Sequence, residues 1–123
     1  IGDIFHIGTC HLQVTQPRQP CFKLNYQFGN SWKLKIPEIA QKYQQTGWFY
    51  SVLQEGIIKT GDDIVLKERM FPSMTVAKVI QNVSSKSKKN VDNMFLEEMV
   101  ENPILDDTWK QKAKRKLKYL SGK

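Results

Sequence analysis

The sequence predicts an α+β chain that is mainly β and ends in a small three-helix unit. Short β-prone runs separated by glycine-containing turns fill most of residues 1–70, which is typical of antiparallel strands. From residue 71 onward, apolar residues recur every third or fourth position, as they do along one face of a helix. We therefore place a domain boundary near residues 69–73, between a β domain over 1–70 and a helical unit over 71–123.

The β part begins with an expected hairpin. Gly8 and Thr9 form its turn, with an apolar strand before them and an alternating strand after them. His6 and His11 flank this turn, but no third or fourth ligand is spaced as a zinc site requires, so ordinary strand histidines are the favoured interpretation. Further strands are expected at Trp48–Leu53, Ile57–Lys59 and Ile64–Leu66.

Apolar spacing and capping residues predict the helices. Lys33–Gln45 is a weak candidate, with Pro37 in its first turn. In the helical unit, Thr75, Asp92 and Asp106 are the expected N-caps. Each cap precedes an apolar stripe: Val76, Val79, Ile80 and Val83 in the first helix, Phe95, Leu96, Met99 and Val100 in the second, and Trp109, Ala113, Leu117 and Leu120 in the third. The basic residues of the third helix are expected on its other faces.

The residues around Cys21 form the most distinctive stretch of the chain. Pro17 and Pro20 fix φ and lack an N–H, so Gln16 to Cys21 is expected to be a stiff extended loop, not a helix or a central strand. Such a loop would hold Cys21 near Arg18, and a neighbouring guanidinium favours the thiolate that attacks or binds metal. The alternative is a buried, inert cysteine with Arg18 as a surface charge, and composition alone favours that alternative.

The run Gln16-Pro17-Arg18-x-Pro20-Cys21, followed by Lys23-Leu24, resembles the cysteine motif of MOSC-domain proteins, named for the C-terminal domain of molybdenum cofactor sulfurase. More narrowly, it is similar to the YiiM-like subgroup, which is linked to resistance to N-hydroxylated purines. Three further stretches match that subgroup in order: Ile1–Phe5, Thr46–Leu53 with Gly56, and Thr75–Trp109. The resemblance implies part of a MOSC-type β-barrel followed by a three-helix unit, and the chain looks like the C-terminal half of such a protein.

The resemblance also implies a chemistry. Cys21 would be the catalytic residue and the protein ligand to molybdenum in a pterin cofactor (molybdopterin), which reduces N-hydroxylated purines, hydroxylamines or amidoximes. Arg18 is the first expected anion contact for the cofactor and Lys23 the second. Gln16 is expected to hydrogen-bond the pterin or shape the loop, and Tyr50 is a weaker candidate for substrate contact or proton relay.

Electrons would come from a separate reductase, because the chain carries no flavin, haem or iron–sulfur signature. The basic third helix is a candidate docking surface for an acidic partner of this kind. Two other classes of function stay open. One is a non-catalytic carrier of cofactor or sulfur, and the other is an interaction module whose open sheet edges pair with another chain, a homodimer included.

The net charge of +7 comes from 19 lysine and arginine residues against 12 acidic ones, and the excess gathers in the last helix. A basic helix can meet nucleic acid, an acidic protein or an anionic surface, but a solvated face is the favoured interpretation. Nucleic acid is disfavoured, because no aromatic side chains interleave with the basic run and lysine outnumbers arginine there.

Composition also bears on location. No apolar run approaches a membrane span, and no segment has the layout of a signal peptide. Cys10 and Cys21 are too few to indicate a disulfide framework. We therefore expect a cytoplasmic protein without a membrane partner.

Overall fold

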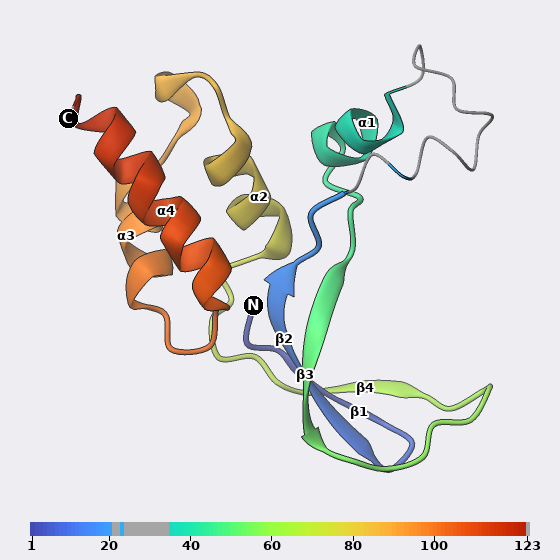
Figure 1. Cartoon of the computed structure of the whole chain (residues 1–123). Helices are drawn as coiled ribbons and strands as arrows, with labels where there is room; N and C mark the ends of the chain where they lie inside the picture. The colour runs from blue at the N-terminus through green and yellow to red at the C-terminus, as the bar shows by residue number, and fades with distance from the viewer. Residues whose placement is uncertain (21–22, 24–34, 123) are drawn as a thin grey trace.

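The computed structural model describes residues 1–20, 23 and 35–122. Its elements are the strands β1 (Ile4–Ile7), β2 (Cys10–Pro17), β3 (Trp48–Gln54) and β4 (Ile64–Glu68), the helices α1 (Ile36–Lys42), α2 (Val76–Ser84), α3 (Asn93–Glu101) and α4 (Asp107–Leu120), and the 3₁₀ turn η2 (Lys88–Asn90). The strands form one antiparallel sheet in the order β3-β2-β1-β4. Helices α2, α3 and α4 gather beside one end of this sheet, and α1 lies apart from them (Figure 1).

The expected first hairpin is confirmed. β1 pairs with β2 from Ile4 opposite Gln13 to Ile7 opposite Cys10, across a turn at Gly8 and Thr9. Gly8 has φ 57°, and a Cβ built there would lie 2.2 Å from the carbonyl oxygen of Ile57. The turn therefore needs glycine both for its backbone conformation and for the close approach of the segment after β3.

The expected strand at Ile57–Lys59 is wrong, because this segment bonds to a turn instead of a neighbouring strand. The Ile57 amide donates to the Thr9 hydroxyl at 2.8 Å, and the Thr9 amide donates to the Ile57 carbonyl at 3.2 Å. The other strands of the β part are confirmed, as β3 and β4.

The expected loop from Gln16 begins later than the sequence indicated. Gln16 and Pro17 belong to β2, a central strand, where they lie opposite Phe49 and Trp48 of β3. Proline is tolerated because Pro17 is the last residue of the strand and follows an irregularity in register between Val14 and Gln16. Among the described residues, the irregular segment starts at Arg18.

The sheet is not closed in the described part of the chain, so the barrel expected from the resemblance is not confirmed. β3 and β4 are its two edges, and every residue of both strands is exposed. Many of these side chains are large and apolar, including Val52 (59% exposed) and Ile64 (66%). Exposed apolar side chains along a sheet edge are typical of a site that meets another polypeptide.

The helical unit follows the capping and spacing expectations. The side chains of Thr75, Asp92 and Asp106 accept hydrogen bonds from backbone amides in the first turns of α2, α3 and α4. The expected stripes form one core, whose fully enclosed members are Val79, Phe95, Leu96, Met99 and Ala113. Helix α1 is shorter than expected, because Tyr43 ends it and Lys35 precedes it with φ 44°, while residues 33–34 lie outside the described residues.

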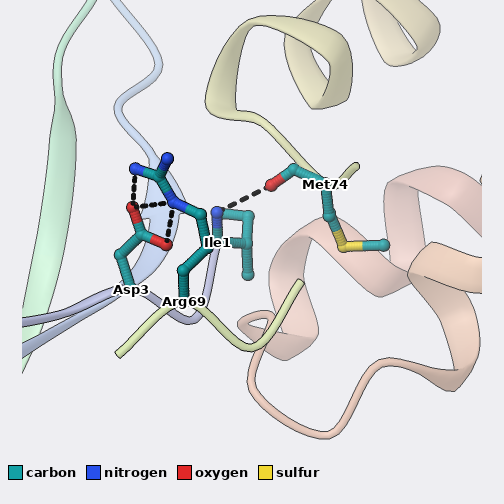
Figure 2. A network of polar contacts seen from close by, with 4 residues as sticks. All are labelled: Ile1, Asp3, Arg69 and Met74. Carbon is teal, nitrogen blue, oxygen red and sulfur yellow. Dashed lines mark hydrogen bonds and ion pairs between the residues drawn. The ribbon is translucent and has the colours of Figure 1, made fainter. Parts of the chain in front are cut away.

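The sheet shares this core with the helices. Ile1 and Val14 are buried in the same cluster as the side chains of α2, α3 and α4. The Asp106 amide donates to the Thr15 carbonyl at 3.0 Å, and the Ile1 nitrogen donates to the Met74 carbonyl at 2.7 Å. Figure 2 shows the second of these bonds beside the ion pair of Asp3 and Arg69. The division into a β domain over 1–70 and a helical unit over 71–123 remains a prediction.

A buried leucine and an exposed methionine in α3 provide a test of this core. Leu96 is fully buried and Met94 is 73% exposed. Leu96→Ala should lower the free energy of unfolding by about 2–5 kcal/mol, because it leaves a cavity among packed side chains. Met94→Ala should change it by less than about 0.5 kcal/mol. Equal shifts in urea unfolding midpoints would contradict the packing described for α3.

The lowered pKa of His6 predicts a pH-dependent stability. His6 and His11 stack with ring centroids 3.6 Å apart, and burial, then repulsion from His11 and Lys67, lowers the pKa of His6. The unfolded chain therefore binds a proton near pH 6.5 more readily than the folded chain, so stability falls as pH drops from about 7.5 to 5.5. His6→Gln should flatten this dependence in urea unfolding. An unchanged slope in the variant would show that His6 does not cause it.

Candidate functional site

A cavity of about 230 Å³ lies where the end of β2 meets the helices. We call it the junction cavity. Its described lining comes from the segment after β2, the segment before β3, and helices α1, α2 and α4: Arg18, Gln19, Pro20, Gln41, Thr46, Ile80, Val83, Ser84, Trp109 and Lys112. Cys21 follows this lining directly in the sequence, but it lies outside the described residues. The junction cavity is therefore lined by the described residues that directly precede the expected metal ligand in the sequence.

Two cations line the junction cavity. Lys112 donates from Nζ to Oε1 of Gln19, and its Nζ lies 4.2 Å from the ring centroid of Trp109. Burial lowers the pKa of Lys112, and repulsion from Arg115 lowers it further. Among the described lining residues there is no carboxylate to balance Lys112 and Arg18. Within the described residues, the one ion pair joins Arg69 to Asp3 and so involves neither cation.

One hydroxyl group in the lining has no hydrogen-bond partner among the described residues. Oγ1 of Thr46 is shielded from solvent and, within the described part of the chain, neither donates nor accepts a hydrogen bond. Leaving such a group unpaired costs about 1–3 kcal/mol. The other lining hydroxyl, on Ser84, is already used, because it donates to the Ile80 carbonyl at 2.7 Å. The described residues thus leave the Thr46 hydroxyl without a partner, whereas the Ser84 hydroxyl is engaged within α2.

Backbone pairing holds the two sides of the cavity together. The Arg18 amide donates to the Gly47 carbonyl at 2.9 Å, extending the β2–β3 ladder by one bond beyond Pro17. Gly47 has φ 83°, a conformation in which glycine is free of steric strain. This bond fixes Arg18 beside Thr46, although the two residues are far apart in the sequence.

The other expected site residues that are described lie in different parts of the structure. Gln16 is half-buried in β2, and Lys23 is exposed. Tyr50 lies in β3, edge-to-face with Phe5 and Trp48 at centroid distances of 6.2 and 6.5 Å. Of the expected site residues that are described, Arg18 lines the junction cavity, whereas Gln16, Lys23 and Tyr50 do not.

Sequence reasoning missed Lys112 and Thr46. The basic residues of α4 were expected on faces away from its apolar stripe, but Lys112 lies against Trp109 of that stripe and is half-buried. The available signal was the three-residue spacing of Trp109 and Lys112, which places both side chains on neighbouring positions of one helix face. No sequence signal identified Thr46, because its isolation depends on how two distant segments meet.

A second cavity, of about 320 Å³, is lined by residues of β1, β2 and β3 and of the segment between β4 and α2. Its lining is largely apolar and includes Phe5, Trp48, Phe71 and the Asp3–Arg69 pair. The guanidinium of Arg69 donates to both carboxylate oxygens of Asp3, at 2.8 to 3.3 Å. Its charge is therefore balanced within the protein, unlike the charges in the junction cavity.

Among the described residues, no three histidine, cysteine or acidic side chains gather as a metal site. Cys10 is buried and free of a disulfide. In the same part of the chain, no helix combines the length and the apolar character needed to cross a membrane.

Comparison with known proteins supports the resemblance. The model of the MOSC domain family matches residues 1–65. YflK of Bacillus subtilis, an uncharacterised protein, is 30% identical over 119 residues, which are 94% of this chain and 50% of YflK. YiiM of Escherichia coli is 42% identical over 73 residues, 57% of this chain and 30% of YiiM. A protein of Gibberella moniliformis named a reductase is 36% identical over 110 residues, 86% of this chain and 18% of that protein.

Solved structures give the same result. YiiM from Geobacillus stearothermophilus matches 95% of this chain with a TM-score of 0.82 and 28% identity, and 57% of the YiiM chain is covered. YiiM from Escherichia coli matches the whole chain with a TM-score of 0.80 and 30% identity, again with 57% covered. The chain therefore spans about half the length of these structures and half or less of the curated relatives. Because the family model matches more than half of its 123 residues, the chain belongs to the MOSC domain family.

Proposed function

We propose that this protein serves a molybdenum-cofactor-dependent reduction of N-hydroxylated compounds, with Cys21 as the protein ligand to the metal. The observation that carries the proposal is the MOSC match over residues 1–65, which includes the motif from Gln16 to Cys21. Similarity to YiiM and to a protein named a reductase supports the same direction. N-hydroxylated purines, hydroxylamines and amidoximes are the substrate class that we propose.

The residues near the motif suit an anionic cofactor. Arg18 and Lys112 supply positive charge without a carboxylate in the described lining, and Thr46 supplies an unused hydroxyl. Such donors are those that a phosphate-bearing pterin needs, and a thiolate is the soft donor that suits molybdenum. When bound, the cofactor supplies the redox chemistry that removes the hydroxyl oxygen of the substrate as water.

The protein contributes position and charge. The bond from the Arg18 amide to Gly47 anchors the start of the segment that leads to Cys21. Pro20 restricts the backbone conformation of the residue before it, Gln19. Positive side chains near a thiol favour the thiolate, which is the form that binds metal. In this proposal Arg18 is the main anion contact and Lys23 the second, and Gln16 supports the pterin or the loop. Tyr50 is the weakest candidate, because its ring packs against Phe5 and Trp48.

The partners of this reaction are part of the proposal. A separate reductase delivers the electrons in the cytoplasm and docks on the exposed basic residues of α4, without a membrane or nucleic acid. A second candidate function is an interaction or carrier module, favoured by one observation. The apolar side chains of β3 and β4 are exposed on both edges of the sheet, as expected for a surface that pairs with another chain or a second copy.

The ligand role of Cys21 is tested by metal content in the full natural protein. Cys21→Ser should lose nearly all molybdenum, because a neutral hydroxyl does not replace the soft thiolate. Cys10→Ala is the matched control and should retain the metal, since Cys10 is a buried strand residue. Elemental analysis together with pterin fluorescence provides the measurement. Molybdenum retained in the Cys21 variant would refute the ligand role.

Docking of the reductase on α4 is tested by salt. Turnover of an N-hydroxylated purine with a flavodoxin-type reductase should fall several-fold between about 50 and 300 mM salt, because exposed charges are screened over about a Debye length. Turnover driven by dithionite, which needs no protein partner, is the control and should change little. A flat profile with the protein donor would exclude electrostatic docking and leave the reductase chemistry intact.

A further inference from the structure

We propose that the junction cavity is a binding site for a phosphate monoester, and that Lys112 of the helical unit is one of its contacts. This goes beyond the cysteine motif, because Lys112 and Thr46 lie outside that motif. The site shares Arg18 with the proposed cofactor contacts, but its anion binding does not depend on molybdenum. Failure of one proposal is therefore distinguishable from failure of the other.

Charge is the first argument. Arg18 and Lys112 line one cavity, no acidic side chain occurs in its described lining, and neither forms an ion pair with a described carboxylate. Burial disfavours the protonated form of Lys112, and repulsion from Arg115, another cation, disfavours it further. A dianion in the cavity would offset both effects, because an opposite charge favours the charged form of a lysine.

Hydrogen bonding is the second argument. Lys112 has three N–H donors, and Gln19 accepts from it. Oγ1 of Thr46 is a buried donor without a partner in the described chain. A phosphate group offers several strongly accepting oxygens, so it can accept from both side chains and from the guanidinium of Arg18. Buried polar groups that lack protein partners are the ones that a ligand is expected to satisfy.

Size and surroundings set the kind of ligand. At about 230 Å³ the cavity is smaller than the roughly 300–1,000 Å³ typical of pockets that enclose a drug-sized molecule, so it fits one group of a larger ligand. Ile80, Val83 and Trp109 make part of its lining apolar, and Nζ of Lys112 lies 4.2 Å from the ring centroid of Trp109. Charged hydrogen bonds are stronger beside apolar side chains, where the local dielectric is low. The phosphate monoester can belong to the pterin cofactor or to a phosphorylated substrate such as a nucleotide.

The test compares adenosine 5′-monophosphate with adenosine, which differ only in the phosphate, by calorimetric titration of the full natural protein prepared without cofactor. The nucleotide should bind at least about tenfold more tightly, as expected for charge-assisted hydrogen bonds. Lys112→Gln should remove most of that difference. Lys114→Gln, which removes the same charge from an exposed position of α4, should leave it unchanged.

Two outcomes would overturn the proposal. One is equal affinity for nucleotide and nucleoside in the unsubstituted protein. The other is an equal loss of affinity in Lys112→Gln and Lys114→Gln, which would mean that the general charge of α4 attracts the anion.

A second variant separates binding from folding. Thr46→Val removes the unpaired hydroxyl, so it should weaken nucleotide binding several-fold while thermal stability stays equal or rises. A fall in stability with unchanged binding would contradict the role assigned to Oγ1 of Thr46.

Loading with cofactor distinguishes the two sources of phosphate. If the cofactor phosphate fills the cavity, the loaded protein no longer binds the nucleotide and Lys112→Gln lowers pterin content. If the substrate phosphate fills it, the loaded protein still binds the nucleotide, and Lys112→Gln raises KM for an N-hydroxylated nucleotide but not for the free N-hydroxylated base.

Discussion

The contact between β2 and the helical unit is the constraint on which the rest of the structure depends. Val14 is buried among the side chains of α2, α3 and α4, and the Thr15 carbonyl accepts a hydrogen bond from the N-cap residue of α4, Asp106. These contacts fix the end of β2 beside α4. Lys112 can therefore reach Gln19, only two residues before Cys21, and the junction cavity forms between them.

The same contact combines residues with different origins in the chain. The MOSC match ends at residue 65, whereas Lys112 and Trp109 belong to the helices that follow it. The helical unit therefore forms part of this site, because it supplies one wall and one cation of the cavity next to the cysteine motif. The exposed strands β3 and β4 form the two edges of the sheet, and β4 lies at the end of the sheet away from the helices (Figure 1).

Local patterns predicted most elements, but not how distant segments meet. Thr75, Asp92 and Asp106 identified the starts of the helices, since a cap depends only on its own first turn. The spacing of apolar residues predicted the helical core, because it too is a local pattern. The strand expected at Ile57–Lys59 was wrong, because bonds to Thr9 replace it. The loop expected from proline chemistry was wrong at Gln16 and Pro17, which the ladder of β2 accommodates at its end. The partners of Lys112 and the isolation of Thr46 depend on tertiary contacts, which no local pattern encodes.

The central proposal is that Cys21, which directly follows the cavity-lining residue Pro20 in the sequence, acts as a thiolate, and its alkylation rate tests this most directly. The rate with iodoacetamide, followed against pH in the cofactor-free full protein, should rise with a midpoint below the ordinary thiol value of about 8.5. Cys10 is buried and should react slowly, so labelling is assigned by peptide mass. A midpoint shifted upward by Arg18→Gln would support the account. An unreactive Cys21, or a midpoint at or above the ordinary value, would contradict it.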